Sequence, residues 1–219
     1  VIYVDNGSNL DIEAWNNCTP SPADEVIKLN NNLGIAYAHN VGIAWANSIQ
    51  ASYILLMDQD SIPEPGMVDI LWNKAITIKN LAAIGPRYID HRQKNPPPFM
   101  EIKGLRLIRH NCRNSDEVVS VDYLISSGSL IPLSTLNAVG GMKEDLFIDY
   151  VDIEWGLRAK QKGFQSYGMC NAIMQHSLGD DPIKFINRSI PLHSPLRHYY
   201  HFRNAILLYK SSWLPLNWK

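Results

Sequence analysis

The stretch that decides the fold is Ser52-Tyr53-Ile54-Leu55-Leu56-Met57-Asp58-Gln59-Asp60-Ser61, "SYILLMDQDS". A continuous apolar run of this kind is typical of a strand in the middle of a parallel sheet, buried on both faces. Asp58 and Asp60 follow the run one residue apart, and side chains at this spacing lie on the same side of an extended backbone. Their carboxylates repel each other there. The pair therefore predicts a positive partner, and a metal ion is the first candidate.

Strands and helices alternate on both sides of this stretch. The expected strands are 1–4, 25–29, 52–57, 81–89, 118–132, 164–169 and 172–177. The expected helices are 35–49, 62–78, 133–142, 152–163 and a core helix near the C-terminal end. Residues 90–117 are polar and irregular in pattern, and we expect them to form an irregular flap that departs from the alternating strands and helices. This order predicts one α/β domain over 1–219, with a mainly parallel central sheet flanked by helices.

Composition narrows the class of protein. The chain has 219 residues, 46% of them hydrophobic and 19% charged, with a formal net charge of −1. That is typical of a soluble globular protein with one large core, and the neutral balance argues against a nucleic-acid partner. No apolar run reaches the roughly 18 residues of a membrane span. Three scattered cysteines, Cys18, Cys112 and Cys170, show no zinc spacing and predict no disulfide framework, which favours a reducing cytoplasm.

Polar groups follow three of the expected strands, where ligands bind in open α/β sheets. They are Asp5 of "DNGS", the pair Asp58 and Asp60, and His176 after "AIMQ". Taken alone, "DNGS" is most often a turn, and a lone histidine is most often an ordinary surface or core residue. The acidic pair is harder to explain without a cation. Mg²⁺ or Mn²⁺ bound to a nucleoside diphosphate fits it, because such ions take carboxylates together with phosphate oxygens.

Several segments taken in order carry a family resemblance: "VDNGS", "NNNLGIAYAHNVGI", "LLMDQDSIPEPG", "SSGSLIP", "GGMKEDLFIDYVDIEWGLRAKQKGF" and "QHSLG". The series resembles the inverting family-two glycosyltransferases with a GT-A fold, and among them the bacterial rhamnosyltransferases that use dTDP-L-rhamnose. The resemblance covers almost the whole chain. It implies a nucleotide-binding half over 1–89 and an acceptor or catalytic half over 118–204. Relatives begin with one further strand, which this sequence lacks.

The resemblance also implies roles for single residues on the donor side. Asp5 would accept a hydrogen bond from the pyrimidine base. Asp60 would be the main metal ligand, with Asp58 on the nucleotide ribose or the metal and His176 completing the metal site or touching the diphosphate. The expected ion is Mg²⁺ or Mn²⁺, and an imidazole ligand suits Mn²⁺ better than Mg²⁺. The residues expected to line the nucleotide are Asn31, Asn32, Gly34 and Asn40.

The candidate catalytic base is Asp152, in "FIDYVDIEWGLR", where relatives read Glu-Asp and this chain reads Val151-Asp152. Inverting transfer needs a carboxylate opposite the leaving diphosphate to take the acceptor proton. The start of a helix also favours the carboxylate anion. The alternative is that Asp149 or Asp152 only caps the helix.

The remaining expected contacts lie in three segments. Ser127 and Gly128 would lie near the donor sugar and diphosphate, although "SSGSLIP" also reads as a strand with a bulge. Arg203, with Arg197 nearby, would bind the diphosphate, or both would belong to a solvated helix face. Glu154 and Trp155 would contact the acceptor, although Trp155 would suit the core equally.

The function expected from these residues is metal-dependent transfer of L-rhamnose from dTDP-L-rhamnose to a glycan or lipid-linked acceptor in bacterial surface polysaccharide synthesis. The enzyme would be cytoplasmic, with peripheral contact at the inner face of the membrane. Three alternatives stay open: a family-two transferase that uses a UDP-hexose, a nucleotidyltransferase, and a non-catalytic binding module of the same fold.

Overall fold

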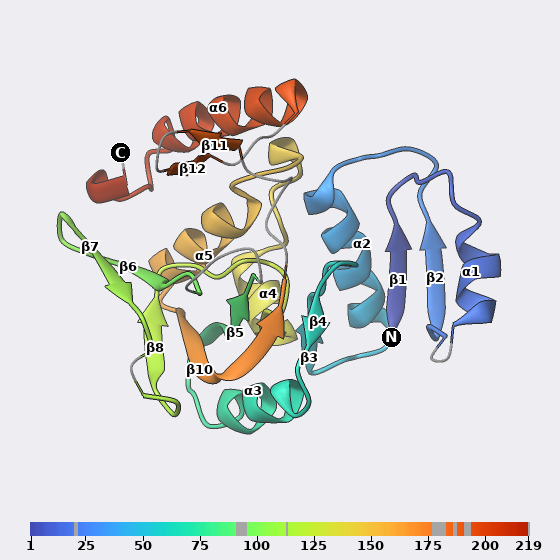
Figure 1. Ribbon diagram of the computed structural model, residues 1–219, viewed down its shortest axis with the longest axis horizontal. Helices are drawn as coiled ribbons and strands as arrows, with labels where there is room; N and C mark the ends of the chain where they lie inside the picture. The colour runs from blue at the N-terminus through green and yellow to red at the C-terminus, as the bar shows by residue number, and fades with distance from the viewer. Residues whose placement is uncertain are drawn as a thin grey trace.

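A mixed sheet lies at the centre of the protein, shown as a computed structural model in Figure 1. The structure describes residues 1–19, 22–90, 96–112, 114–176, 183–185, 188–190 and 194–218. The strand order is β3-β9-β5-β10-β4, and β8 also pairs with β10. These strands are β3 (Tyr53–Leu55), β4 (Ile62–Pro63), β5 (Leu81–Ile89), β8 (Val118–Val121), β9 (Leu130–Pro132) and β10 (Gln165–Gln175).

The central sheet is less parallel than the sequence predicts. Only β5 and β10 run parallel in it, whereas β9 is antiparallel to both β3 and β5. Strands β4 and β8 are antiparallel to β10. The α/β class is confirmed, and "mainly parallel" is corrected to mixed.

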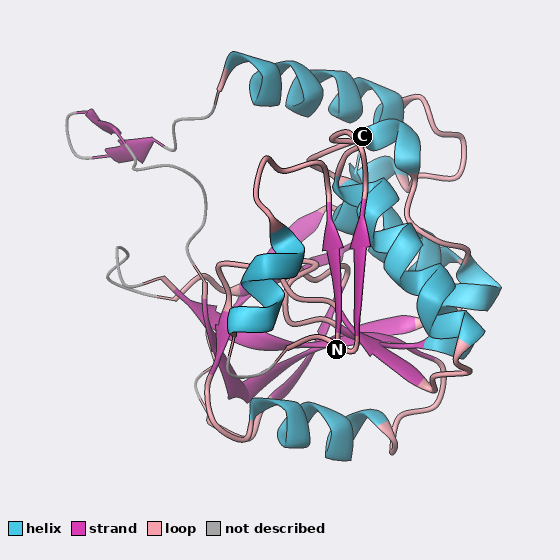
Figure 2. Ribbon diagram, turned by 90° about the vertical axis from the view of Figure 1, so that its right-hand side faces the viewer, coloured by secondary structure: helices cyan, strands magenta, loops and turns pink. Residues whose placement is uncertain are grey.

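Helices cover both faces of this sheet. On one face lies α3 (Met67–Ala75), which buries Met67, Leu71 and Ala75 at the predicted helical spacing. The other face carries α2 (Ile35–Ser48), α4 (Leu133–Val139) and α5 (Val151–Gln161). Figure 2 shows α3 below the strands and α6 (Pro195–Tyr209) at the opposite end of the molecule. With both faces covered, an edge of the sheet is left for the loops after β3 and β10, which carry the polar groups.

Helix α2 uses a different face from the one that its apolar spacing indicates. The buried residues are Ala36, Ile43 and Ala46, whereas Ile49 follows the helix and is exposed. The apolar residues spaced four apart in the sequence, Tyr37, Val41 and Trp45, would form the buried face by that spacing, but they are only half-buried. Small side chains allow the helix to approach its neighbours closely, and the apolar spacing gives no weight to alanine.

A second, two-stranded sheet carries the N-terminal segment. Strands β1 (Ile2–Asp5) and β2 (Glu25–Lys28) pair in parallel, as predicted, but form a ladder separate from the central sheet. Between them lies α1 (Ile12–Cys18), which the sequence reading missed. The Asp11 carboxylate caps it by accepting from Ala14 N at 3.1 Å. The Asp5 turn therefore follows a strand outside the central sheet.

Three further differences concern short elements. The expected irregular excursion holds a β-hairpin, β6 (Phe99–Lys103) and β7 (Arg106–His110). The two short strands expected near 170 are one strand, β10, whose pairing with β5 shifts register between Met169 and Ile173. Residues 177–179 of "QHSLG" lie outside the described residues. The remaining short elements are η1 (Glu144–Leu146), β11 (Ile183–Phe185), β12 (Arg188–Ile190) and η2 (Leu216–Trp218).

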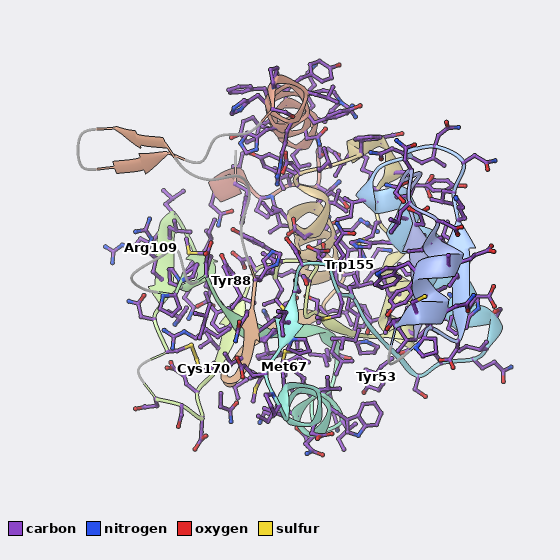
Figure 3. The ribbon with its side chains drawn as sticks, turned by 45° about the vertical axis from the view of Figure 1, so that its right-hand side comes forward. Tyr53, Met67, Tyr88, Arg109, Trp155 and Cys170 are labelled. Carbon is purple, nitrogen blue, oxygen red and sulfur yellow. A yellow bond between two sulfur atoms is a disulfide. The ribbon has the colours of Figure 1, made fainter. Side chains whose placement is uncertain are left out.

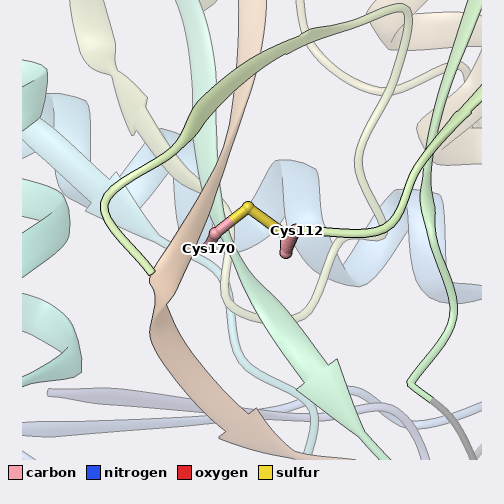
Figure 4. Close-up of a disulfide and its surroundings, with 2 residues drawn as sticks. All are labelled: Cys112 and Cys170. Atoms are coloured by element: carbon pink, nitrogen blue, oxygen red, sulfur yellow. A yellow bond between two sulfur atoms is a disulfide. The ribbon is translucent and has the colours of Figure 1, made fainter. Parts of the chain in front are cut away.

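A disulfide joins Cys112 to Cys170, tying the segment after the hairpin to β10 (Figure 4). The two residues are 58 positions apart and their Cα atoms lie 5.4 Å apart, while Cys18 is free and exposed. The expectation of no disulfide is therefore wrong, because local cysteine spacing carries no information about a pairing that the sheet creates. The inference of a reducing compartment loses its basis.

Candidate active site

Two carboxylates and an imidazole meet at the edge of the central sheet. Strand β3 leads into the loop that holds Asp58 and Asp60, and β10 ends directly before His176. One oxygen of each carboxylate and one ring nitrogen of His176 lie within 4.8 Å of one another. His176 Nδ1 is 3.4 Å from Asp60 Oδ1. His176 is thus brought beside residues that lie 116 and 118 positions earlier in the sequence.

The environment of Asp58 supports a cation at this cluster. Burial raises the pKa of the Asp58 carboxyl; the imidazole of His176 lowers it and the charge of Asp60 raises it again. A bound divalent cation would offset the burial and the repulsion by Asp60 together. Two carboxylate oxygens with one imidazole nitrogen form a donor set that suits Mn²⁺. The residues present therefore fit a divalent cation.

A chain of hydrogen bonds supports this cluster from behind. Asp58 N donates to Ser127 Oγ at 3.0 Å, and Ser127 Oγ donates to Ser61 Oγ at 2.7 Å. Ser61 Oγ is in turn 2.7 Å from His176 Nδ1. Because Ser127 is only 1% exposed, it does not reach a donor directly in this structure, and its expected donor contact is corrected to support of the cluster. Ser61 was not predicted, and its only signal is its place directly after Asp60.

Gly128 also has an internal reason to be glycine. Its φ is 80°, and a Cβ here would lie 2.6 Å from the Pro86 ring. Any larger residue would push the loop off β5. The structure gives Gly128 this packing role, and a contact with the donor stays a prediction.

The loop after β1 is preorganised around Asp5. Asp5 Oδ1 accepts from Ser8 N at 3.1 Å, and Asp5 Oδ2 is buried without a hydrogen-bond partner among the described residues. Asn6 Nδ2 donates to Asn32 Oδ1 at 3.0 Å, and Asn6 Oδ1 accepts from Leu33 N at 2.9 Å. An orphaned carboxylate oxygen suits a ligand with a hydrogen-bond donor, such as a pyrimidine N3–H. Asn31 and Asn32 are exposed beside this loop, as a nucleotide contact requires.

Gly34 and Asn40 serve the protein itself. A Cβ on Gly34, whose φ is 89°, would lie 2.6 Å from the ring of Phe147, so glycine permits this close approach. Asn40 Nδ2 donates to Met142 O at 2.9 Å and to Glu144 Oε1 at 2.8 Å, and its Oδ1 accepts from Met142 N at 2.7 Å. The expected nucleotide contact of Asn40 is not met, because its amide is already bound on both sides.

Asp152 lies in the first turn of α5, as predicted. Its Oδ1 accepts from Ile153 N at 2.8 Å. The pKa of the Asp152 carboxyl is raised to about 6, mainly by burial. Hydrogen bonds from backbone N–H groups act to lower it, and the charges of Asp149 and Asp58 contribute to the rise. A carboxyl with this pKa is mostly ionised at neutral pH and is still a usable base. The capping alternative fails for Asp149, because the cap residue is Tyr150 and the Asp149 carboxylate pairs with Arg197 at 3.2 Å.

Two tyrosines that the sequence reading missed accompany Asp152. Burial, together with the charges of Tyr123, Asp90 and Asp152, raises the pKa of Tyr88 to about 12. The Tyr88 ring also stands edge-on to His176 at 6.1 Å between centroids (Tyr88 is labelled in Figure 3). Burial raises the pKa of Tyr123 as well, with Asp152 the strongest charge on it. Tyr88 therefore lies near both His176 of the cluster and the candidate base.

Glu154 and Trp155 are interior residues, although the sequence reading gave them acceptor roles. Each is 3% exposed. Glu154 binds Arg158 at 2.8 Å, and Trp155 Nε1 donates to Gly140 O at 2.9 Å (Figure 3). The expected acceptor contacts are therefore wrong for this structure, and the core alternative for Trp155 holds.

The two arginines of α6 bind protein groups. Arg203 donates to the carbonyl of Asp145 and lies 5.1 Å from the centre of the Tyr200 ring. Arg197 binds Asp149. The structure does not place either guanidinium beside the Asp58, Asp60 and His176 cluster, so a diphosphate contact of Arg203 stays a prediction that needs the side chain to move.

The comparisons with known proteins agree with this geometry. The sequence profile of Glycosyl transferase family 2 matches residues 1–123, more than half of the 219. The chain is 34% identical over 218 residues to the dTDP-rhamnosyl transferase RfbF of Shigella flexneri, and the match covers 99% of this chain and 72% of that protein. Asp152 and His176 lie beyond the profile match but within the span of this relative.

Solved structures show the same fold. GalNAc-T7, crystallised with UDP, GalNAc and Mn²⁺, matches 89% of this chain with a TM-score of 0.63 and 11% identity. TarS of S. aureus matches 97% with a TM-score of 0.51 and 15% identity. The chain spans only 39% and 34% of these two proteins. The fold is the GT-A fold of glycosyltransferases, and the chain belongs to glycosyl transferase family 2.

Proposed function

We propose that the protein transfers L-rhamnose from dTDP-L-rhamnose to a hydroxyl of a glycan or lipid-linked acceptor, with a divalent cation, in bacterial surface polysaccharide synthesis. The observation that carries the proposal is the 34% identity to a dTDP-rhamnosyl transferase over 99% of the chain. The site supports it with three assembled parts: an orphaned acceptor at Asp5, a cation-binding cluster, and a half-buried carboxylate at Asp152.

The chemistry is a single displacement at the anomeric carbon. Asp5 would hold the base of the nucleotide, and Asp58, Asp60 and His176 would hold the cation. The cation supplies charge neutralisation to the leaving diphosphate. Asp152 takes the proton from the acceptor hydroxyl as that oxygen attacks. Because the attack comes from the face opposite the leaving group, a β-linked donor gives an α-rhamnoside.

Donor identity is tested by following nucleotide release from dTDP-L-rhamnose and from UDP-hexoses, with Mn²⁺ or Mg²⁺ present. The proposal expects dTDP-L-rhamnose to be consumed and dTDP to compete with it better than UDP. The UDP alternative stays in the test because the free oxygen of Asp5 accepts equally from thymine or uracil N3–H. Turnover of a UDP-hexose alone would support that alternative, and pyrophosphate formation from a nucleoside triphosphate would support a nucleotidyltransferase. Tight binding of dTDP-L-rhamnose without turnover, with an acceptor supplied, would indicate a binding module.

The proposal of a lipid-linked acceptor at the membrane is based on helix α6. In the described part of the chain, no helix is long and apolar enough to cross a membrane. Helix α6 exposes the apolar and aromatic side chains Leu196, Tyr199, Phe202, Ile206 and Tyr209. Such residues favour peripheral contact with the inner face of the membrane, where a lipid-linked acceptor is presented.

The pH dependence of the reaction should report Asp152. Its pKa is raised to about 6. A protonated carboxyl cannot accept the acceptor proton, so kcat/KM should be flat above this pKa and fall about tenfold per pH unit below it. The measurement is kcat/KM for the acceptor between pH 4.5 and 8 at saturating cation. A profile flat down to pH 4.5 would exclude a carboxyl with a raised pKa as the base.

A further inference from the structure

The segment directly before Asp152 has an unusual backbone. Phe147, Asp149 and Tyr150 all have φ near 63°, and none of them is glycine. At Phe147 the chain makes a tight γ-turn, in which Ile148 N donates to Leu146 O at 2.7 Å. Left-handed backbone at non-glycine residues is rare and persists only where the surroundings hold it. Something must therefore hold residues 147–150.

The holding group is the side chain of Asn204 on α6. Its Nδ2 donates to Leu146 O and Ile148 O, both at 2.8 Å, and to Asp149 O at 3.0 Å. Asn204 is fully buried. The unusual turns are what bring three backbone carbonyls to one amide nitrogen.

Other residues of α6 hold the same segment. The Phe147 ring stacks on Tyr200 at 4.7 Å between centroids, and Arg197 binds the carboxylate of Asp149. Figure 1 shows α6 lying above the start of α5. From the opposite side, Ile35 N donates to Phe147 O at 2.8 Å. The segment thus lies between α6 and the start of α2, next to the loop proposed to hold the nucleotide.

We infer that Asn204 is a positioning residue for catalysis, which fixes residues 147–150 and thereby sets where the Asp152 carboxylate lies relative to the acceptor. The inference rests on the proposed function, because it takes Asp152 as the base. Tyr150 is the cap residue of α5, so its backbone conformation sets the direction of the first turn, in which Asp152 lies. Without the three hydrogen bonds the segment relaxes toward ordinary backbone, and the base moves. Asn204 has no role in binding the donor.

The test compares Asn204→Ala with Leu208→Ala in the full chain. Leu208 lies one turn further along α6 and is also buried in the core, and its side chain has no hydrogen-bonding group. Both variants should lower the melting temperature. At a temperature where both are folded, Asn204→Ala should lower kcat for dTDP release from dTDP-L-rhamnose by about 100-fold, the effect of a displacement of about 1 Å. Its Kd for dTDP should stay within about twofold, and Leu208→Ala should keep the kcat of the wild type.

A near-normal kcat in folded Asn204→Ala, or an equal loss of kcat in Leu208→Ala, overturns the inference. If Asn204→Ala does not fold, Arg197→Ala decides, because Arg197 holds the same segment through Asp149 and its side chain is 37% exposed, so this variant should fold. A lower kcat with unchanged dTDP binding supports the inference, and an unchanged kcat overturns it.

Hydrogen exchange separates this inference from the proposed function. If the wild type turns over no dTDP-L-rhamnose, the proposed function fails. The effect of the Asn204 hydrogen bonds on residues 147–150, called here the clamp, can still be measured. Asn204→Ala should speed amide exchange at residues 147–153, and Leu208→Ala should not. Unchanged protection of these amides in Asn204→Ala overturns the positioning role.

Discussion

Asp152→Asn should lower rhamnosyl transfer by about 10²- to 10⁴-fold, the usual contribution of a general base. The amide has nearly the shape of the carboxylate but cannot take a proton from the acceptor hydroxyl. The Asp152 carboxylate is not one of the three groups that meet in the cation cluster. Donor binding should therefore survive, and calorimetry with dTDP and Mn²⁺ should give a Kd close to that of the wild type.

The matched control is Asp69→Asn, the same chemical change at an exposed residue in the first turn of α3. It should leave both transfer and dTDP binding unchanged. Two outcomes would contradict the assignment of Asp152. One is transfer by Asp152→Asn at more than about a tenth of the wild-type rate. The other is loss of dTDP binding in that variant, which would assign Asp152 to the donor site instead.

The sequence predicts well what depends on local pattern. β5 lies at 81–89 as expected, because a long apolar run between turn residues has few alternatives. The family resemblance assigned Asp58, Asp60 and His176 to one site, and the structure brings the three side chains together. The helix expected over 152–163 is α5, and Asp152 lies in its first turn as expected.

The failures at the site come from tertiary contacts. Glu154 and Trp155 lie on the helix that was predicted, but which face of α5 is buried depends on α4 and the loop at Gly140. The family resemblance assigned the amide of Asn40 to the nucleotide, and its actual partner at Met142, 102 positions away, cannot be seen in the local sequence. The clamp at Asn204 joins residues 55 to 58 positions apart through backbone turns that no side-chain pattern announces. Local sequence carries the positions of the reacting groups, whereas their support is visible only in the fold.

Removal of the cation should abolish transfer nearly as completely as loss of the base. Asp60→Asn is expected to lower kcat/KM for dTDP-L-rhamnose by more than about 100-fold, since even an outer-shell partner of a metal ligand is typically worth 10- to 100-fold. The carboxylate is replaced by a neutral group, so nothing balances the charge of the cation at that position. EDTA should inactivate the wild type, and added Mn²⁺ should restore it.

A comparison of Ser61→Ala with Asp152→Asn shows whether a loss of transfer is caused by weaker cation binding. Ser61 Oγ is hydrogen-bonded to His176 and to Ser127 behind the cluster, so Ser61→Ala should weaken Mn²⁺ binding by about 10- to 100-fold and regain transfer at high Mn²⁺. Asp152→Asn should bind Mn²⁺ normally and regain nothing. If EDTA leaves the wild type fully active, the cluster of Asp58, Asp60 and His176 is not a metal site. The repulsion between the two carboxylates would then have to be relieved by a positive group of the substrate, which a nucleoside diphosphate does not have.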